Sequence, residues 1–227
     1  MNVEELLERI KQNHRYAKEK CMPHIKWLGI IKDDLGQYQM GDLPDGAKKV
    51  NVPEDMDELM VKAIPFQIIA IVIIVVSVFV KVSLAKELPF SPVWVVVGFM
   101  LGFLALIIHE LLHAIVFPKK ATVYVGIYPK SFGAVALSSY PLKRWRFVLM
   151  SLLPMVLGVV PILLLWILPP EYKVANGLML GMAMMGLTSP AVDIYNVCKV
   201  LGETPRGCTL QFHGDNLYYY DEKYKNV

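Results

Sequence analysis

Four long apolar segments, separated by polar and charged stretches, dominate the pattern of the chain. They lie at about 63–82, 93–117, 147–168 and 174–200. Each is close to the roughly 20 helical residues that a hydrocarbon core requires. The pattern therefore predicts a membrane protein with an all-α core of about four transmembrane helices. A cytoplasmic region at 1–62 and a cytoplasmic tail at 201–227 are expected on either side of it.

The loop at 121–142 differs from an ordinary connector. Its runs Thr122-Val123-Tyr124-Val125 and Phe132-Gly133-Ala134-Val135-Ala136-Leu137 are typical of strands and are separated by Pro129-Lys130-Ser131. They predict a β-hairpin at the cytoplasmic membrane surface. The tail, from Gly207 to Tyr220, similarly predicts two short strands across a turn.

Small and polar residues follow one face of the second, third and fourth apolar segments. In the second segment Gly98, Gly102, Ala105, His109 and His113 succeed one another at steps of three or four. Small residues allow membrane helices to approach closely. We therefore expect these three helices to share a packed interface.

Composition and charge support a multi-pass protein of the cell membrane. The chain is 55% hydrophobic, with a mean hydropathy of +0.45. Its Lys and Arg residues gather before the first segment, between the second and third, and after the fourth, which predicts that both termini are cytoplasmic. A net charge of only +3 gives no reason to expect nucleic acid as a partner. The expected partners are membrane lipid and a membrane-associated protein substrate.

The second segment contains His109-Glu110-Leu111-Leu112-His113, an HExxH motif. Residues four apart share a helix face, so His109 and His113 can bind one Zn²⁺ while Glu110 reaches a water molecule on it. Glu110 can accept the proton of that water and later deliver it to a leaving amine. Such a polar cluster is costly at bilayer depth and usually marks a functional site. Its alternative role is a structural cluster that holds helices together.

Asp193 is the predicted third zinc ligand, since a catalytic zinc takes three protein ligands and leaves a position for water. It is the only acidic residue within the fourth segment. With the second and fourth spans running in the same direction, it lies at a depth similar to that of His113. Asn196, one turn later, is a candidate to orient a ligand or bind substrate; the alternative is a plain interhelical hydrogen bond. The alternative third ligands follow the fourth segment: His213, and less favourably Glu203 and Asp215.

With the HExxH motif, the strand-like loop, Asp193, and Thr204-Pro205-Arg206-Gly207 in the tail, the chain resembles a bacterial membrane family of zincin peptidases. The resemblance extends from about Asp42 to Tyr220. That family is similar to the site-2 proteases, intramembrane metalloproteases that cleave membrane-anchored regulators. The resemblance implies that His109, His113 and Asp193 bind zinc and that Glu110 is the base. It also implies that the loop around 123–135 receives an unwound substrate as an added strand. Site-2 proteases typically flank the aspartate with glycine or Asn-Pro, which this chain replaces with Ser189-Pro190 and Asn196.

The sequence thus predicts a zinc-dependent membrane-embedded endopeptidase that hydrolyses peptide bonds of membrane-associated proteins through a zinc-activated water. The alternative is a non-enzymatic membrane scaffold or chaperone that retains a structural metal site. A metal transporter is less favoured, because the polar groups gather at one end of the apolar segments instead of following the full bilayer depth.

Overall fold

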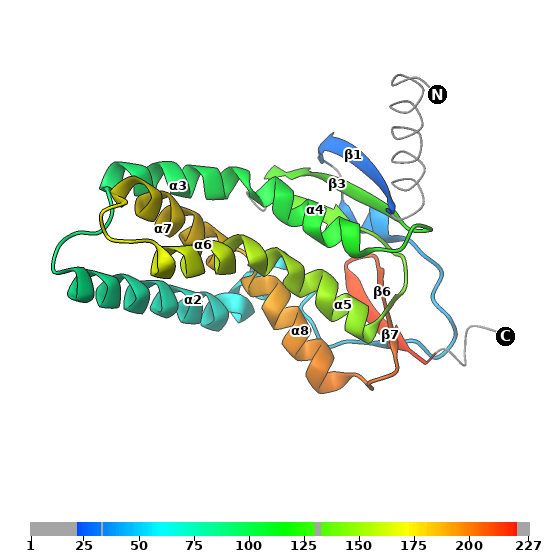
Figure 1. The fold of residues 1–227 in the computed structure, drawn as a ribbon. Helices are drawn as coiled ribbons and strands as arrows, with labels where there is room; N and C mark the ends of the chain where they lie inside the picture. The colour runs from blue at the N-terminus through cyan, green and yellow to red at the C-terminus, as the bar shows by residue number, and fades with distance from the viewer. Residues whose placement is uncertain (1–21, 33, 130–132, 222–227) are drawn as a thin grey trace, which may run out of the picture.

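The computed structural model describes residues 22–32, 34–129 and 133–221. Its helices, with two 3-10 turns η1 and η3, are η1 (Leu35–Gln39), α2 (Met56–Ala85), α3 (Pro92–Leu104), α4 (Leu106–Val116), α5 (Arg144–Leu152), η3 (Leu153–Met155), α6 (Val156–Ile167), α7 (Lys173–Thr188) and α8 (Ala191–Glu203). Its strands are β1 (His24–Ile30), β2 (Lys48–Lys49), β3 (Thr122–Tyr128), β4 (Gly133–Leu137), β5 (Leu142–Lys143), β6 (Thr209–His213) and β7 (Asn216–Tyr220). The strands gather at one end of the helices (Figure 1).

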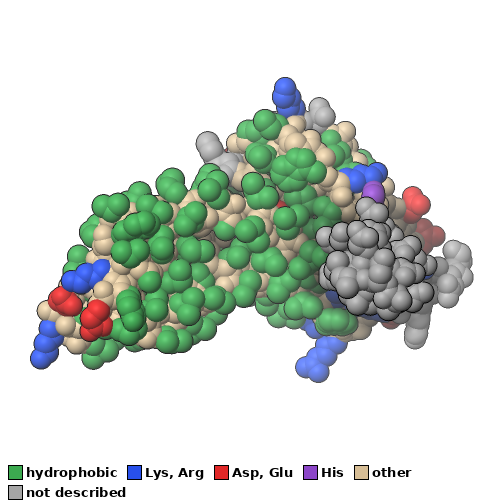
Figure 2. All heavy atoms as spheres, turned by 45° about the horizontal axis from the view of Figure 1, so that its top comes forward, with side chains coloured by type: hydrophobic (Ala, Val, Ile, Leu, Met, Phe, Trp, Pro, Cys, Tyr) green, Lys and Arg blue, Asp and Glu red, His purple; other side chains and the backbone are tan. Residues whose placement is uncertain are grey.

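Three helices among the described residues are long and apolar enough to cross a membrane: Met56–Ala85, Pro92–Val116 and Arg144–Ile167. Lys173–Thr188 and Ala191–Glu203 make a fourth if they count as one span despite a bend of 40° between them. Large apolar side chains point outward from these helices, with Phe79 71% and Ile167 74% exposed. Hydrophobic side chains cover most of the visible helical surface in Figure 2, with charges at its tip. An apolar surface of this extent is compatible with a membrane location.

The predicted segments and the observed helices differ mainly at their ends and breaks. α2 begins at Met56, where the Asp55 side chain accepts a hydrogen bond from the N–H of Asp57 and caps the helix. The second predicted span is divided into α3 and α4 at Ala105. The fourth is broken at Ser189-Pro190, since proline lacks the N–H that would continue the helical ladder.

Glycines set the close approach of α7 to α3 and to α6. A Cβ atom at Gly181 would lie 2.1 Å from the carbonyl oxygen of Val95, and one at Gly158 would lie 2.3 Å from the carbonyl carbon of Gly186. No larger side chain fits at these distances, so the helices pack backbone against backbone. This confirms the predicted interface of small residues shared by the three apolar segments.

We expect Gly181→Ala to destabilise the fold by about 1–3 kcal/mol, the usual cost of overpacking, because the new methyl group meets backbone that cannot rotate away. The measurement is the midpoint of thermal unfolding in detergent. Gly202→Ala in α8 is the matched control, since a Cβ atom there has no neighbour within 4 Å and alanine favours the helix. Equal midpoints for the two variants would contradict the packing described.

The described strands form two sheets, ordered β1-β3-β4 and β2-β7-β6-β5. β3 and β4 are antiparallel, with Val125 opposite Ala136, which confirms the hairpin predicted at 121–142. β6 and β7 confirm the two strands predicted in the tail. Three strands were not predicted: β1, which pairs in parallel with β3, β2, which pairs with β7, and β5, which pairs with β6.

The first sheet is anchored to the helices by the inward side chains of β3. Val123 and Val125 are fully buried, and alternate strand residues point to the same face of a sheet. They belong to one hydrophobic cluster with Ala114 of α4 and Phe147 of α5. This packing holds β4 directly beside α4, the helix that carries the HExxH motif.

Candidate metal centre

The two histidines of the motif lie on one face of α4 and are both buried. The helical spacing of four residues brings their rings together, with 4.8 Å between ring centroids. The Nε2 atoms are 3.1 Å apart. The two histidines therefore offer their nitrogens to a common point, as predicted from the sequence.

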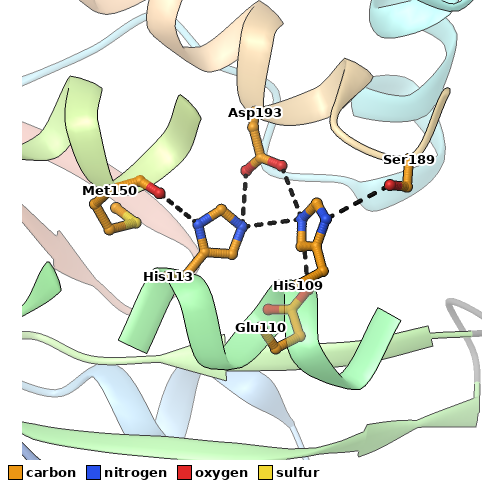
Figure 3. Close-up of polar contacts among 6 residues, drawn as sticks. All are labelled: His109, Glu110, His113, Met150, Ser189 and Asp193. Atoms are coloured by element: carbon orange, nitrogen blue, oxygen red, sulfur yellow. Dashed lines mark hydrogen bonds and ion pairs between the residues drawn. The ribbon is translucent and has the colours of Figure 1, made fainter. Parts of the chain in front are cut away.

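Asp193 reaches the same point from α8. Its Oδ2 atom is 3.3 Å from the Nε2 atom of His109, and its Oδ1 atom is 3.5 Å from the Nε2 atom of His113 (Figure 3). Asp193 lies in the first turn of α8, where the positive end of the helix dipole favours a carboxylate. The break after α7 creates this helix start, so the bend at Ser189-Pro190 helps to place the carboxylate.

Hydrogen bonds on the far side of each ring orient the histidines. The Nδ1–H group of His113 donates to the backbone carbonyl of Met150 at 2.7 Å. The Nδ1 atom of His109 lies 3.5 Å from the hydroxyl oxygen of Ser189 (Figure 3). A ring that carries its proton on Nδ1 leaves a lone pair on Nε2, which is the form in which histidine binds a metal.

The donor set fits a tetrahedral zinc ion. At metal–ligand lengths of about 2.0–2.1 Å, two tetrahedral ligands lie roughly 3.3–3.4 Å apart, and the three separations found here are 3.1, 3.3 and 3.5 Å. Two nitrogen lone pairs and a carboxylate at such distances repel one another unless a proton or a metal cation lies between them. His109, Glu110 and His113 also form a group whose ligand atoms lie within 4.8 Å of one another.

Glu110 stands beside the three converging groups instead of among them. Its Oε1 atom is 3.9 Å from the Nε2 atom of His109, longer than the other separations. The backbone N–H of Ala136 in β4 donates a hydrogen bond to its carboxylate. Glu110 therefore lies between the histidine pair and β4, within reach of a molecule bound next to the histidines.

A cavity of about 580 Å³ opens onto these groups. Its walls include β4, α4, the first half of α2 and the start of α8. Asn196 lines it, and the Oδ1 atom of this side chain is buried without a hydrogen-bond partner among the described residues. Asn196, predicted to orient a ligand or bind substrate, thus lies in the cavity wall with an acceptor still free.

The alternative third ligands do not join the three converging groups of His109, His113 and Asp193. His213 donates from Nδ1 to the carbonyl of Gly41 at 2.7 Å. Glu203 pairs with Lys199 at 2.5 Å. Asp215 lines the cavity but forms no ion pair with either histidine within the described ranges.

Two partners of the histidines were not identified from the sequence. Ser189 precedes Asp193 by four residues, and a search for polar side chains one turn from the predicted ligand would have found it. The carbonyl of Met150 has no such signal, because every residue carries one. Its position depends on where α5 packs against α4.

In comparisons with known proteins, residues 102–209 match a protein-family model. No curated protein and no solved structure matches the chain. The matched part, residues 102–209, contains His109, Glu110, His113 and Asp193. Over these residues the chain matches the model of a family described as "putative zincin peptidase", which supports placing it among the zincin peptidases.

Proposed function

We propose that this protein is a zinc-dependent membrane-embedded endopeptidase that hydrolyses peptide bonds of membrane-associated proteins. The observation that carries the proposal is the convergence of two Nε2 atoms and one carboxylate within 3.5 Å of one another, beside a glutamate. The family match and the apolar helices support the two parts of this proposal, the metallopeptidase chemistry and the membrane setting.

His109, His113 and Asp193 would hold the zinc ion, which leaves one tetrahedral position free for water or substrate. When bound, zinc polarises a carbonyl group and lowers the pKa of water, so that hydrolysis needs no covalent enzyme intermediate. Met150 and Ser189 hold the two imidazoles in the ligating orientation. This fixed arrangement reduces the reorganisation required when the metal binds.

Glu110 is the proposed proton carrier. It accepts a proton from the attacking water and delivers it to the nitrogen of the leaving amine. The hydrogen bond from Ala136 fixes one side of the carboxylate and leaves the other free to face the cavity. A fixed carboxylate keeps the proton acceptor aligned with the attacking water.

β4 is the proposed platform for the scissile peptide. Among the described strands it pairs only with β3, and Glu110 accepts the N–H of Ala136, so the remaining backbone groups on its other edge, which β3 does not use, are available to an extended chain. Residues Gly133–Leu137 line the cavity beside the histidines. A peptide added along this edge would gain main-chain hydrogen bonds, and the free Oδ1 atom of Asn196 would accept one more. The relationship to site-2 proteases, for which such strand addition is expected, stays a prediction.

The proposed orientation places both termini and the two sheets in the cytoplasm, with the metal centre near that face of the membrane. It rests on the Lys and Arg residues that gather before α2, after α4 and after α8. An even number of crossings requires α7 and α8 to act as one bent span.

The test is metal analysis of the purified protein together with cleavage of membrane-anchored reporter proteins in nanodiscs. We expect about one zinc per chain, and cleavage that a chelator removes and added zinc restores. Bound zinc without cleavage of any reporter would favour the scaffold or chaperone alternative. Absence of zinc from the natively purified protein, with no uptake on addition, would reject the proposal.

A further inference from the structure

The cavity at the metal centre has two chemically different ends. One end is walled by apolar side chains of the membrane-type helices, among them Met60 of α2 and Phe103 of α3. These two residues are 42% and 48% exposed, so this end opens at the apolar surface of the molecule. Gln67 is the single polar side chain that α2 contributes to the cavity wall. This end therefore suits an apolar segment that arrives from the lipid.

The other end is formed by the strand-bearing part and carries carboxylates. Asp215 and Glu54 line the wall there, together with Gln39. Asp215 is held in place by the turn that precedes it. Gly214 adopts a left-handed φ of 58°, donates its N–H to the carbonyl of Gln39 at 3.1 Å, and accepts from the Nε2 atom of Gln39 at 3.2 Å. The carboxylate is thus a fixed feature of the cavity mouth.

The charge at this end is net negative. Burial, and then the neighbouring carboxylates of Asp34 and Glu54, raise the pKa of Asp215 above its ordinary value. Glu54 is neutralised by an ion pair with Lys49. Asp215 forms no ion pair within the described part of the chain, so its charge remains available to a bound molecule. Asp34 does not line the cavity, but it is likewise without an ion pair there and adds its negative charge next to Asp215.

The wall of the cavity also contains an acceptor that lacks a donor. The Oδ1 atom of Asn196 is buried against the cavity and has no partner among the described residues. A buried acceptor without a donor costs free energy, and the N–H of an extended peptide that threads the cavity would supply one. This feature is independent of the carboxylates and points to a peptide as the occupant.

We propose that the cavity selects a peptide segment at the point where an apolar stretch gives way to Lys or Arg residues, with the apolar part between α2 and α3 and the basic part beside Asp215. This proposal rests on the proposed function and names its substrate class. The boundary between a transmembrane helix and its cytoplasmic flank has this composition. The scissile bond would then lie where a substrate leaves the lipid, between the two parts.

The experiment measures binding, so that it does not depend on turnover. Full-length protein with Glu110→Gln, loaded with zinc in nanodiscs of uncharged lipid, is titrated with peptides that share one apolar segment. The segment is flanked at both ends by Lys-Lys, Gln-Gln or Glu-Glu, so the chain direction does not matter. We expect the Lys-Lys peptide to bind about tenfold more tightly than the Gln-Gln peptide at low ionic strength, with the preference falling as salt is added.

Variants locate the preference in the cavity. Asp34→Asn with Asp215→Asn, which removes the carboxylate of the cavity wall and its charged neighbour, should abolish the preference. Asp45→Asn with Asp221→Asn, equal in charge change at two residues that do not line the cavity, should retain it. Asp215→Lys should reverse it in favour of the Glu-Glu peptide.

The inference is overturned if the three peptides bind alike, if none binds, or if both double variants lose the preference equally. Zinc content and reporter cleavage by the parent protein are measured separately. A parent that cleaves reporters without this preference would overturn the inference and leave the proposed function intact. A parent without zinc or cleavage would overturn the proposed function first.

Discussion

Replacing Glu110 by Gln is expected to lower the rate of peptide hydrolysis by about 10²–10⁴-fold, the range over which a positioned acid–base group acts. Gln has nearly the same shape and can still accept the hydrogen bond from Ala136, but it cannot take up a proton. Zinc content should remain unchanged, because Glu110 stands 3.9 Å from the nearest ligating nitrogen and outside the set of three converging groups.

The measurement is reporter cleavage in nanodiscs alongside metal analysis of the same sample. Glu58→Gln is the matched control, since Glu58 is exposed in the first turn of α2 and does not line the cavity. Retention of parental cleavage by the Glu110 variant would rule out the proposed proton transfer. Loss of zinc from this variant would instead make Glu110 a ligand.

Removing the carboxylate at position 193 is expected to have the largest effect on metal binding. Asp193→Ala leaves two nitrogens where zinc requires three protein ligands, so affinity should fall by more than the roughly 10–100-fold that loss of an outer partner of a ligand costs. Cleavage should disappear at ordinary zinc concentrations. The measurement is zinc affinity by competition with a chelator of known strength.

The alternative ligands provide the controls for this experiment. Glu203→Ala changes a carboxylate of the same helix, and His213→Ala removes a histidine that hydrogen-bonds to Gly41. Both variants should bind zinc as the parent protein does. If either lost zinc while Asp193→Ala kept it, the coordination proposed here would be wrong.

The sequence predicted the helices and the histidine pair well because both are encoded locally. Length and hydropathy identify an apolar helix from its own residues, and the spacing of His109 and His113 fixes their common face. Asp193 was predicted from its depth in the bilayer, an argument that depends only on the direction of two helices. The structure brings its carboxylate to within 3.5 Å of both histidines.

The sheets were predicted only where the partner strands are neighbours in the chain. Only four residues of the chain separate β3 from β4, whereas β1 pairs with β3 from about a hundred residues away. Such pairing depends on how the whole chain packs, and no periodicity in residues 24–30 distinguishes it from any other short apolar run. The same holds for the carbonyl of Met150, whose role depends on the position of α5 and not on its side chain.

The walls of the cavity come from three separate stretches of the chain. Residues 35–67 and 212–217 contribute the acidic mouth and the α2 side of the apolar entrance. Both stretches lie outside residues 102–209, which match the family model and hold every group proposed for the chemistry, together with Phe103 on the other side of the entrance. The acidic mouth is thus built by stretches of the polypeptide that differ from the stretch holding the groups proposed for catalysis. Relatives that keep the hydrolytic machinery can therefore acquire new targets by changing only the outer stretches, with no alteration next to the metal.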